Sequence, residues 1–226
     1  MAPPGADMVA VDDLVKHYEA GFIRALNGVS FQVAAGEAIA LMGPSGCGKT
    51  TLLNLIAALD RPTSGEIRID GKPLDGHRPF DRFRSTYIGF VFQLHHLIPV
   101  LTLIENVEVA AYPTGLDRRR RREKAAALLV GLGLADRMQA LPSRLSGGER
   151  QRGAVARALI NDPRIILADE PTGNVDSETG ARILELLTAR SADQGTTVII
   201  ATHSQEVARA ANRTVYLRDG LVEKIA

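Results

Sequence analysis

The segment GPSGCGKT at residues 43–50 fits the pattern G-x-x-x-x-G-K-[ST]. An apolar run precedes it and an amphipathic run follows it, so a strand and a helix are expected to flank a loop. Backbone N–H groups at glycines and at the start of a helix can approach phosphate oxygens closely, because no β-carbon is in the way. Lys49 adds positive charge for the β- and γ-phosphates, and Thr50 offers a hydroxyl to Mg²⁺. The predicted phosphate-binding residues are Gly43, Pro44, Ser45, Gly46, Cys47, Gly48, Lys49, Thr50 and Thr51.

A second segment, IILADE at residues 165–170, places two carboxylates directly after an apolar run. A strand here would deliver Asp169 and Glu170 to its carboxyl end, the usual ligand edge of an open α/β sheet. Mg²⁺ prefers oxygen ligands, and Asp169 can supply one. Glu170 can position a water for in-line attack on a γ-phosphate. The phosphate loop alone is compatible with kinases, GTPases and many ATPases, and the Asp169-Glu170 pair reduces the number of these enzyme classes that fit. The alternative without a catalytic role is a surface Asp-Glu pair at a strand end.

The segment LSGGERQRGAVARAL at residues 145–159, taken with the two motifs above, resembles the ATP-binding-cassette (ABC) ATPases. The resemblance covers nearly the whole chain, and the family's signature motif matches LSGGE. Ser146 offers a hydroxyl, and Gly147 and Gly148 offer unhindered backbone N–H groups where a helix starts. The motif is therefore a second phosphate-binding helix N-terminus, without a lysine.

The resemblance implies a reason for two phosphate-binding helix ends in one chain. In the family, two copies pair head to tail, and the loop at 43–50 of one copy and the Ser146–Gly148 segment of the other clasp the same ATP. Glu149 completes the motif. ATP and Mg²⁺ are the implied cofactors, a homodimer is the implied assembly, and closure around ATP converts binding into motion.

Four further positions match the family. Tyr18 looks like an aromatic that stacks on adenine. Gln93 looks like a glutamine that touches Mg²⁺ and the attacking water and that opens a segment facing a membrane partner. His203 resembles a histidine that contacts the γ-phosphate, and Asp176 resembles an aspartate in a loop that crosses the dimer interface. Apart from the resemblance, Tyr18 would be an ordinary strand residue, and Gln93 and His203 would be polar residues at strand ends.

Smaller features of the motifs support separate interpretations. The adjacent His95 and His96 could suggest a metal site, but no third ligand is in view, so we interpret them as surface of the partner-facing segment. Gly153 lies inside the helix after the signature, where glycine costs about 1 kcal/mol relative to alanine, and it suggests close packing. Cys47 lies in the phosphate loop, which leads to the hypothesis that alkylating it blocks ATP binding.

Hydrophobic periodicity predicts the elements that must position these residues. An apolar run at 37–42, bounded by glycines, predicts a buried strand. Two short β-branched runs, at 164–168 and 196–201, are typical of strands covered on both faces of a parallel sheet. The helical period over 49–59 places Leu52, Leu53, Ile56 and Leu59 on one face. Further strands are expected within 9–35, at 65–70, at 87–92 and in a hairpin around Asp219-Gly220, and further helices within 94–162 and over 177–190.

The predicted fold class is α/β, with the parallel core sheet of a P-loop ABC ATPase, an N-terminal antiparallel β subdomain and an α-helical subdomain at about 94–160. The length of 226 residues suits a single domain, in which residues 1–8 are expected to be a disordered tail. The only charge run, DRRRRREKAAALL at 117–129, is interpreted as the solvated start of an amphipathic helix, with lipid or nucleic-acid contact as the alternative.

Composition limits the classes of partner. The formal net charge is +1, which argues against a nucleic-acid partner. The single cysteine cannot form an internal disulfide and fits a reducing compartment. The first residues lack the pattern of a signal peptide, and the uncharged stretch at 88–104 falls short of a spanning helix. We therefore expect a protein on the cytoplasmic side of the inner membrane, attached peripherally through a permease subunit.

Within the ABC family, PTGNVDSETG at 171–180 is similar to the lipoprotein-releasing and macrolide-exporting group. That resemblance implies an ATPase subunit that drives export or release of a lipoprotein, peptide, drug or lipid. A cell-division ATPase that signals to wall hydrolases shares every motif and remains the alternative. DNA-repair and ribosome-associated ABC ATPases fit less well, because Thr50 and Leu145 are only about 95 residues apart with no heptads between them and the chain holds one cassette.

Overall fold

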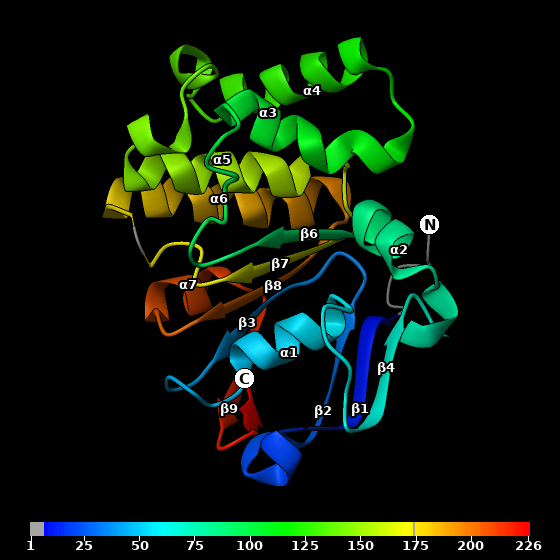
Figure 1. Cartoon of the computed structure of the whole chain (residues 1–226). Coiled ribbons are helices and arrows are strands. Elements are labelled where there is room, and N and C mark those ends of the chain that lie inside the picture. Colours follow the sequence, from blue (N-terminus) through cyan, green and yellow to red (C-terminus); the bar gives the residue numbers. More distant parts are fainter. Residues whose placement is uncertain (1–6, 174) are drawn as a thin grey trace.

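The computed structural model of the chain describes residues 7–173 and 175–226 (Figure 1). Residues 1–6 of the expected tail lie outside the described residues. The expectation is wrong for Asp7 and Met8, which already belong to the first strand. Asp7 pairs with Ala34 of the neighbouring strand, and the Met8 side chain is buried in the core, so both contribute to the sheet.

An antiparallel sheet forms the N-terminal part, in agreement with the prediction. Its strands are β1 (Asp7–Tyr18), β2 (Ile23–Ala34), β4 (Ser64–Ile69) and β5 (Lys72–Pro73), in the order β2-β1-β4-β5. Along β2, buried residues alternate with more exposed ones from Val29 to Val33, as expected for a strand with one face on a core.

The second sheet carries the predicted parallel core. Its strands are β3 (Ala38–Met42), β6 (Ile88–Val91), β7 (Ile165–Asp169), β8 (Thr197–Thr202), β9 (Arg213–Arg218) and β10 (Leu221–Ile225), in the order β10-β9-β3-β8-β7-β6. All neighbouring pairs are parallel except the predicted hairpin of β9 and β10. Every residue of β3, β7 and β8 is buried, which explains their continuous apolar runs.

Helices cover this sheet and connect its strands. They are α1 (Lys49–Ile56), α2 (Phe80–Tyr87), α3 (Leu103–Glu108), α4 (Arg118–Gly131), α5 (Gly147–Leu159), α6 (Ser177–Gln194) and α7 (Gln205–Ala210). Short 3₁₀ helices lie at Glu19–Gly21, Leu74–His77, Val109–Thr114, Ala135–Arg137 and Pro142–Arg144. Periodicity had not indicated α2 and α7, which are only eight and six residues long.

The helix α1 lies between the two sheets (Figure 1). Its Leu52, Leu53 and Ile56 join one buried cluster with residues of both sheets, including Val9 and Leu167. The helix ends earlier than predicted, because Ala58 takes a left-handed φ of 53° just after the cap at Ala57. Leu59, expected on the buried face, is consequently exposed.

The helices between residues 94 and 160 gather at one end of the molecule, above α6 (Figure 1). They begin at Leu103 rather than 94, and residues 94–102 form turns and irregular backbone. Leu103, Leu129 and Ala156, from α3, α4 and α5, share one buried cluster. Gly153 permits this packing, as predicted: a β-carbon there would lie 2.4 Å from Leu103 Cδ1.

The arginine run forms the first turns of α4, with Asp117 as its N-cap. Carboxylates lie close to its side chains: Arg119 pairs with Glu123 at 2.8 Å and Arg122 with Glu108 at 3.3 Å. The first pair, four residues apart, lies on an exposed helix face, whereas the second joins α4 to a buried glutamate of α3. Among the described residues, no helix is both long enough and apolar enough to span a bilayer.

Gly89 gives a test of how tightly the helices pack on the sheet. A β-carbon at Gly89 of β6 would lie 2.4 Å from the carbonyl oxygen of Ala158 in α5 and 2.9 Å from Pro163. Backbone cannot yield as a side chain does, so Gly89→Ala should destabilise the fold by about 1–3 kcal/mol in urea unfolding. Gly131→Ala is the control, because open space surrounds Gly131 at the end of α4. Equal stability of both variants would contradict this packing.

Candidate active site

Four parallel strands bring the predicted residues to one edge of the core sheet. The phosphate loop follows β3, Asp169 ends β7 and Glu170 comes next, His203 follows β8, and Gln93 lies two residues after β6. Because β3, β8, β7 and β6 are consecutive neighbours in the sheet, their carboxyl ends form one continuous rim. Residues separated by more than 100 positions in the chain thus meet at one site.

The phosphate loop depends on its glycines for close approach of backbone segments. Gly46 and Gly48 have φ of 80° and 105°, in the left-handed region. A β-carbon at Gly48 would lie 2.5 Å from the carbonyl oxygen of Ala25 in β2, and one at Gly43 would lie 2.2 Å from that of Leu217. The loop therefore packs against both sheets and leads directly into α1, whose N-terminal N–H groups carry the helix's positive end.

Lys49 places its ammonium within the loop. Its Nζ donates to the carbonyl oxygens of Gly43 at 2.7 Å and Pro44 at 3.0 Å, and the residue is largely buried. Cys47 is buried beneath the loop in the main core cluster, with Sγ 3.9 Å from Lys49 Nζ. A reagent must open the loop to reach this thiol, and its alkylation stays a prediction.

A threonine and a carboxylate meet where Mg²⁺ was expected. Thr50 Oγ1 donates to Asp169 Oδ2 at 2.8 Å, joining α1 to the end of β7. Burial raises the pKa of the Asp169 carboxyl, and so does neighbouring Glu170, while Thr50 and Lys49 act in the opposite direction. No cluster of three or more His, Cys, Asp or Glu side chains suited to a metal occurs among the described residues. A metal with one carboxylate, one hydroxyl and substrate phosphates as ligands is the usual arrangement for Mg²⁺, and these residues fit it.

Glu170 is held by the adjacent strand. It has a left-handed φ of 45°, and its N–H donates to the carbonyl oxygen of Ala201 at 2.9 Å. His203 Nδ1 lies 2.8 Å from Glu170 Oε1, and Thr202 Oγ1 donates to Oε2 at 3.3 Å. The Glu170 side chain is mostly buried while that of His203 is exposed, so the histidine covers the carboxylate from the solvent side.

One cavity of about 470 Å³ contains most of these groups. Its lining includes the predicted residues Tyr18, Ser45, Gly46, Gly48, Lys49, Thr50, Thr51, Gln93, Asp169, Glu170 and His203. Arg24 also lines it and was missed by the sequence reasoning. The β1–β2 pairing sets Arg24 opposite His17, next to Tyr18, so only the register of this hairpin could have revealed it.

The segment after Gln93 is anchored to α5. Arg157 donates to the carbonyl oxygens of His95 at 2.6 Å and His96 at 2.5 Å, two residues with left-handed φ. The Phe92 ring contacts the rings of Phe90 and His96, with centroids 4.2 and 4.9 Å apart. Burial lowers the pKa of His95. This anchored turn replaces the helix that was expected to begin at 94.

The signature residues lie apart from this cavity. Ser146 is the N-cap of α5: its Oγ accepts from Glu149 N at 3.2 Å, and Ser146 N donates to Glu149 Oε2 at 2.7 Å. Hydrogen bonding from the Ser146 backbone lowers the pKa of Glu149 despite partial burial. Gly147 and Gly148 begin the helix, and none of these four residues lines the cavity that holds Lys49 and Glu170. The structure of a single copy therefore does not bring the two predicted phosphate-binding helix ends together.

Unlike the signature residues, Asp176 lies near Glu170 and His203. It caps α6 by accepting from Thr179 N at 2.9 Å and Thr179 Oγ1 at 2.8 Å, and these bonds lower the pKa of its carboxyl. It also lines a cavity of about 250 Å³ together with Glu170 and His203. The loop at Asp176 thus connects the rim of the sheet to the start of α6.

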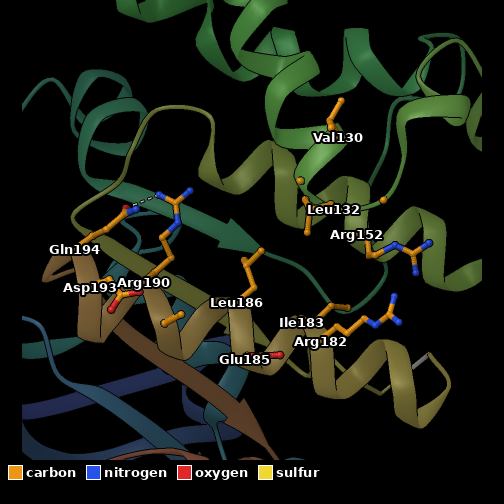
Figure 2. A pocket seen from close by; sticks show the side chains of 13 residues that line it. Val130, Leu132, Arg152, Arg182, Ile183, Glu185, Leu186, Arg190, Asp193 and Gln194 are labelled. Carbon is orange, nitrogen blue, oxygen red and sulfur yellow. Dashed lines mark hydrogen bonds between the residues drawn. The ribbon is translucent and has the colours of Figure 1, made fainter.

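A larger cavity, about 610 Å³, lies between the end of α4 and α6 (Figure 2). Leu132, Ile183 and Leu186 give it an apolar lining. Arg152 and Arg182 extend together toward one side, whereas Arg190 turns to Gln194 and forms a hydrogen bond of 2.7 Å. Its lining contains none of the predicted site residues, which lie instead around the cavity of about 470 Å³.

Comparisons with known proteins agree with this geometry. The model of the ABC transporter family matches residues 26–173. The chain is 45% identical over 217 residues to an uncharacterized ABC transporter ATP-binding protein of Thermotoga maritima, covering 94% of this chain and 92% of that protein. It is 43% identical to the lipoprotein-releasing system ATP-binding protein LolD of Syntrophus aciditrophicus, covering 94% and 97%. A macrolide export ATP-binding/permease protein MacB of Syntrophobacter fumaroxidans is 44% identical, and the match spans 96% of this chain and 31% of that protein.

A solved structure resembles the whole fold. The ATP-binding cassette MJ0796, captured as a dimer in a post-hydrolysis state with ADP and Pi, superposes with a TM-score of 0.91 at 42% identity, covering 97% of this chain and 98% of that one. The Thr50–Asp169 contact and the phosphate loop thus occur in a fold that hydrolyses ATP. The chain belongs to the ABC transporter family and is an ATPase, the nucleotide-binding subunit of a transporter.

Proposed function

We propose that this ATPase drives export or release of a lipoprotein, peptide, drug or lipid, through a membrane permease, by closing two of its copies around ATP. The observation that carries the proposal is the separation of Ser146 from the cavity that holds Lys49 and Glu170. A second copy of the chain can supply the missing helix end by twofold symmetry. The dimeric relative with ADP and Pi supports this arrangement.

The binding half of the mechanism belongs to the phosphate loop and α1. Loop N–H groups and the N-terminus of α1 donate to phosphate oxygens, and Lys49 exchanges its carbonyl partners for the β- and γ-phosphates. Thr50 and Asp169 would hold Mg²⁺, with Gln93 completing its contacts. When bound, Mg²⁺ neutralises charge on the β- and γ-oxygens. Tyr18, which lines the same cavity, stacks on the adenine ring.

The hydrolytic half belongs to Glu170. Its carboxylate accepts a proton from the attacking water as the water approaches the γ-phosphorus in line with the departing ADP oxygen. His203 and Thr202 orient this carboxylate through the contacts at 2.8 and 3.3 Å. His203 also reaches the γ-phosphate, so it connects the general base Glu170 with the phosphate group whose bond to ADP is broken.

The groups that close the site come from the second copy. Ser146, Gly147 and Gly148 present a hydroxyl and free N–H groups at the start of α5 to the γ-phosphate held by the first copy. The Asp176 loop, next to Glu170 and His203, lies at the same interface. ATP then holds the two copies together, and loss of the γ-phosphate releases them.

The permease is proposed to dock on the segment that follows Gln93. Leu94 is 68% exposed and Val100 81% exposed, while Arg157 fixes the turn between them. Exposed apolar side chains on an anchored segment are typical of a protein interface. In the MacB relative, an ATP-binding part and a permease share one name, which supports a membrane partner for this chain. With such a partner, we infer a peripheral location on the cytoplasmic side of the inner membrane.

The main test uses Glu170→Gln, which keeps the size of the side chain and removes its basicity. This variant should bind ATP, hydrolyse it about 10²–10⁴-fold more slowly and accumulate as a dimer, because the γ-phosphate is no longer lost. Size-exclusion chromatography with light scattering measures the dimer. Lys49→Ala, which should bind ATP weakly, is the control expected to stay monomeric. A Glu170→Gln variant that binds ATP yet stays monomeric would argue against closure of the isolated chain.

Ser146→Ala tests whether Ser146 contributes to ATP turnover or only caps the N-terminus of α5. Loss of the cap should cost about 0.5–2 kcal/mol of stability. Thr102→Ala is the matched control, because Thr102 Oγ1 donates to Glu105 Oε2 at 2.6 Å in the capping box at the start of α3, away from the site. Both variants should lose similar stability in thermal melts, but only Ser146→Ala should lower ATP turnover, by about tenfold or more. Equal turnover in the two would leave Ser146 a cap and nothing else.

Val100→Asp tests the docking segment. The charge should prevent an apolar contact with the permease while leaving ATP turnover of the isolated chain unchanged. The measurement is recovery of permease with tagged chain from solubilised membranes in the presence of ATP. Val130→Asp is the control, since Val130 is exposed at the far end of α4. Equal permease recovery with both variants would place the interface elsewhere.

A further inference from the structure

Tyr18 is tied to the far end of α1 by an aspartate outside all three motifs. The Tyr18 hydroxyl donates to Asp60 Oδ2 at 2.8 Å. The other carboxylate oxygen, Oδ1, accepts from Lys16 Nζ at 2.8 Å and from Arg61 N at 2.7 Å. Lys16 Nζ also donates to the Arg61 carbonyl at 2.7 Å. The three side chains form a closed frame between β1 and the turn after α1.

The frame also fixes the plane of the Tyr18 ring. Lys16 Nζ lies over the ring, 4.7 Å from its centroid, so the ammonium covers one ring face. The ring borders the cavity that contains Lys49 and Thr50. A flat base can therefore stack only on the face that Lys16 leaves open.

The protonation states of Tyr18 and Asp60 favour a lasting hydrogen bond between the two side chains. Burial and the hydrogen bond to Asp60 raise the pKa of Tyr18, although Thr51 acts to lower it, so the hydroxyl stays a donor. Partial burial opposes ionisation of Asp60, but hydrogen bonds from Lys16, Arg61 and Tyr18 lower its pKa on balance. The Lys16 side chain is 12% exposed, so its pairing with Asp60 is less screened than that of a surface pair.

The position of Asp60 in the chain shows which parts of the nucleotide site the frame connects. The phosphate loop opens α1 at Lys49, and Asp60 follows the end of the same helix. Tyr18 is the last residue of β1, in the other sheet. The frame thus sets the distance and angle between an aromatic ring and a phosphate-binding loop that belong to different elements.

We propose that Asp60 is a positioning residue for the nucleotide base: by holding Tyr18 against Lys16, it orients the ring so that a base can stack while the triphosphate occupies the loop. The inference rests on the proposed stacking role of Tyr18. Asp60 does not line the cavity that holds Lys49 and Thr50, and it acts by restricting the motion of the Tyr18 ring. Preorganisation of this kind raises affinity without a new contact to the ligand.

The test separates base binding from phosphate binding. Dissociation constants of Mg²⁺-ATP and Mg²⁺-triphosphate, the inorganic chain without a base, are measured by titration calorimetry for each variant. Asp60→Ala and Tyr18→Phe should each weaken ATP binding about three- to tenfold, the size of one oriented aromatic contact. Triphosphate affinity should stay unchanged. The double variant should bind ATP no more weakly than either single variant, because both remove the same link.

Two further variants control for a loss of ATP affinity that comes only from a disturbed fold. Asp60→Asn keeps an acceptor for the Tyr18 hydroxyl and should restore ATP affinity toward that of the natural chain. Asp12→Ala removes a different ion pair, to Arg68 at 2.5 Å on the same sheet, and should change neither affinity. Unchanged ATP affinity in Asp60→Ala, or equal loss of ATP and triphosphate affinity, would overturn the inference.

The outcomes also distinguish this inference from the proposed function. Full ATP affinity in Tyr18→Ala would remove the stacking role, and the inference with it, while ATP-dependent closure would stand on the Glu170→Gln result. A natural chain that binds neither ATP nor triphosphate would overturn both.

Discussion

A nucleoside triphosphate carries several negative charges on adjacent oxygens, and a site for it must surround those oxygens with donors in a small space. The phosphate loop meets this requirement through Gly43 and Gly48, where β-carbons would strike the carbonyl oxygens of Leu217 and Ala25. The loop is therefore pressed between the two sheets, and its shape depends on both. Lys49, held by the carbonyl oxygens of Gly43 and Pro44, brings its ammonium into this loop.

The sheet order determines what surrounds this loop. Because β3, β8, β7 and β6 are adjacent and parallel, Asp169, Glu170, His203 and Gln93 reach the same rim. The contacts there join elements in pairs: Thr50 with Asp169, and Glu170 with His203. The signature at Ser146 belongs to a helix that packs with α3 and α4, away from the rim. The signature therefore lies outside the cavity of its own copy, which is the arrangement that the proposed closure of two copies requires.

The motifs and the buried strands could be predicted from the sequence, because each is short and local in its chemistry. The phosphate loop, β7 and β8 required only a glycine pattern and continuous apolar runs. Leu59 was misplaced because the end of α1 depends on the left-handed φ of Ala58, which no periodicity reveals. The turn at His95 and His96 depends on Arg157, and the Tyr18 frame on Asp60; both are contacts between residues more than 40 positions apart. Arg24 became visible only through the register of β1 and β2.

Complementation between two inactive variants tests most directly whether each ATP site is shared between copies. Lys49→Ala destroys the phosphate loop and keeps the signature, whereas Ser146→Arg blocks the signature and keeps the loop. If the site is shared, a mixed dimer contains one intact site, and mixing the variants should produce ATP hydrolysis that neither shows alone. Differently tagged chains recovered together verify that mixed dimers form. Mixed dimers with no more activity than the separate variants would contradict a site completed by the second copy.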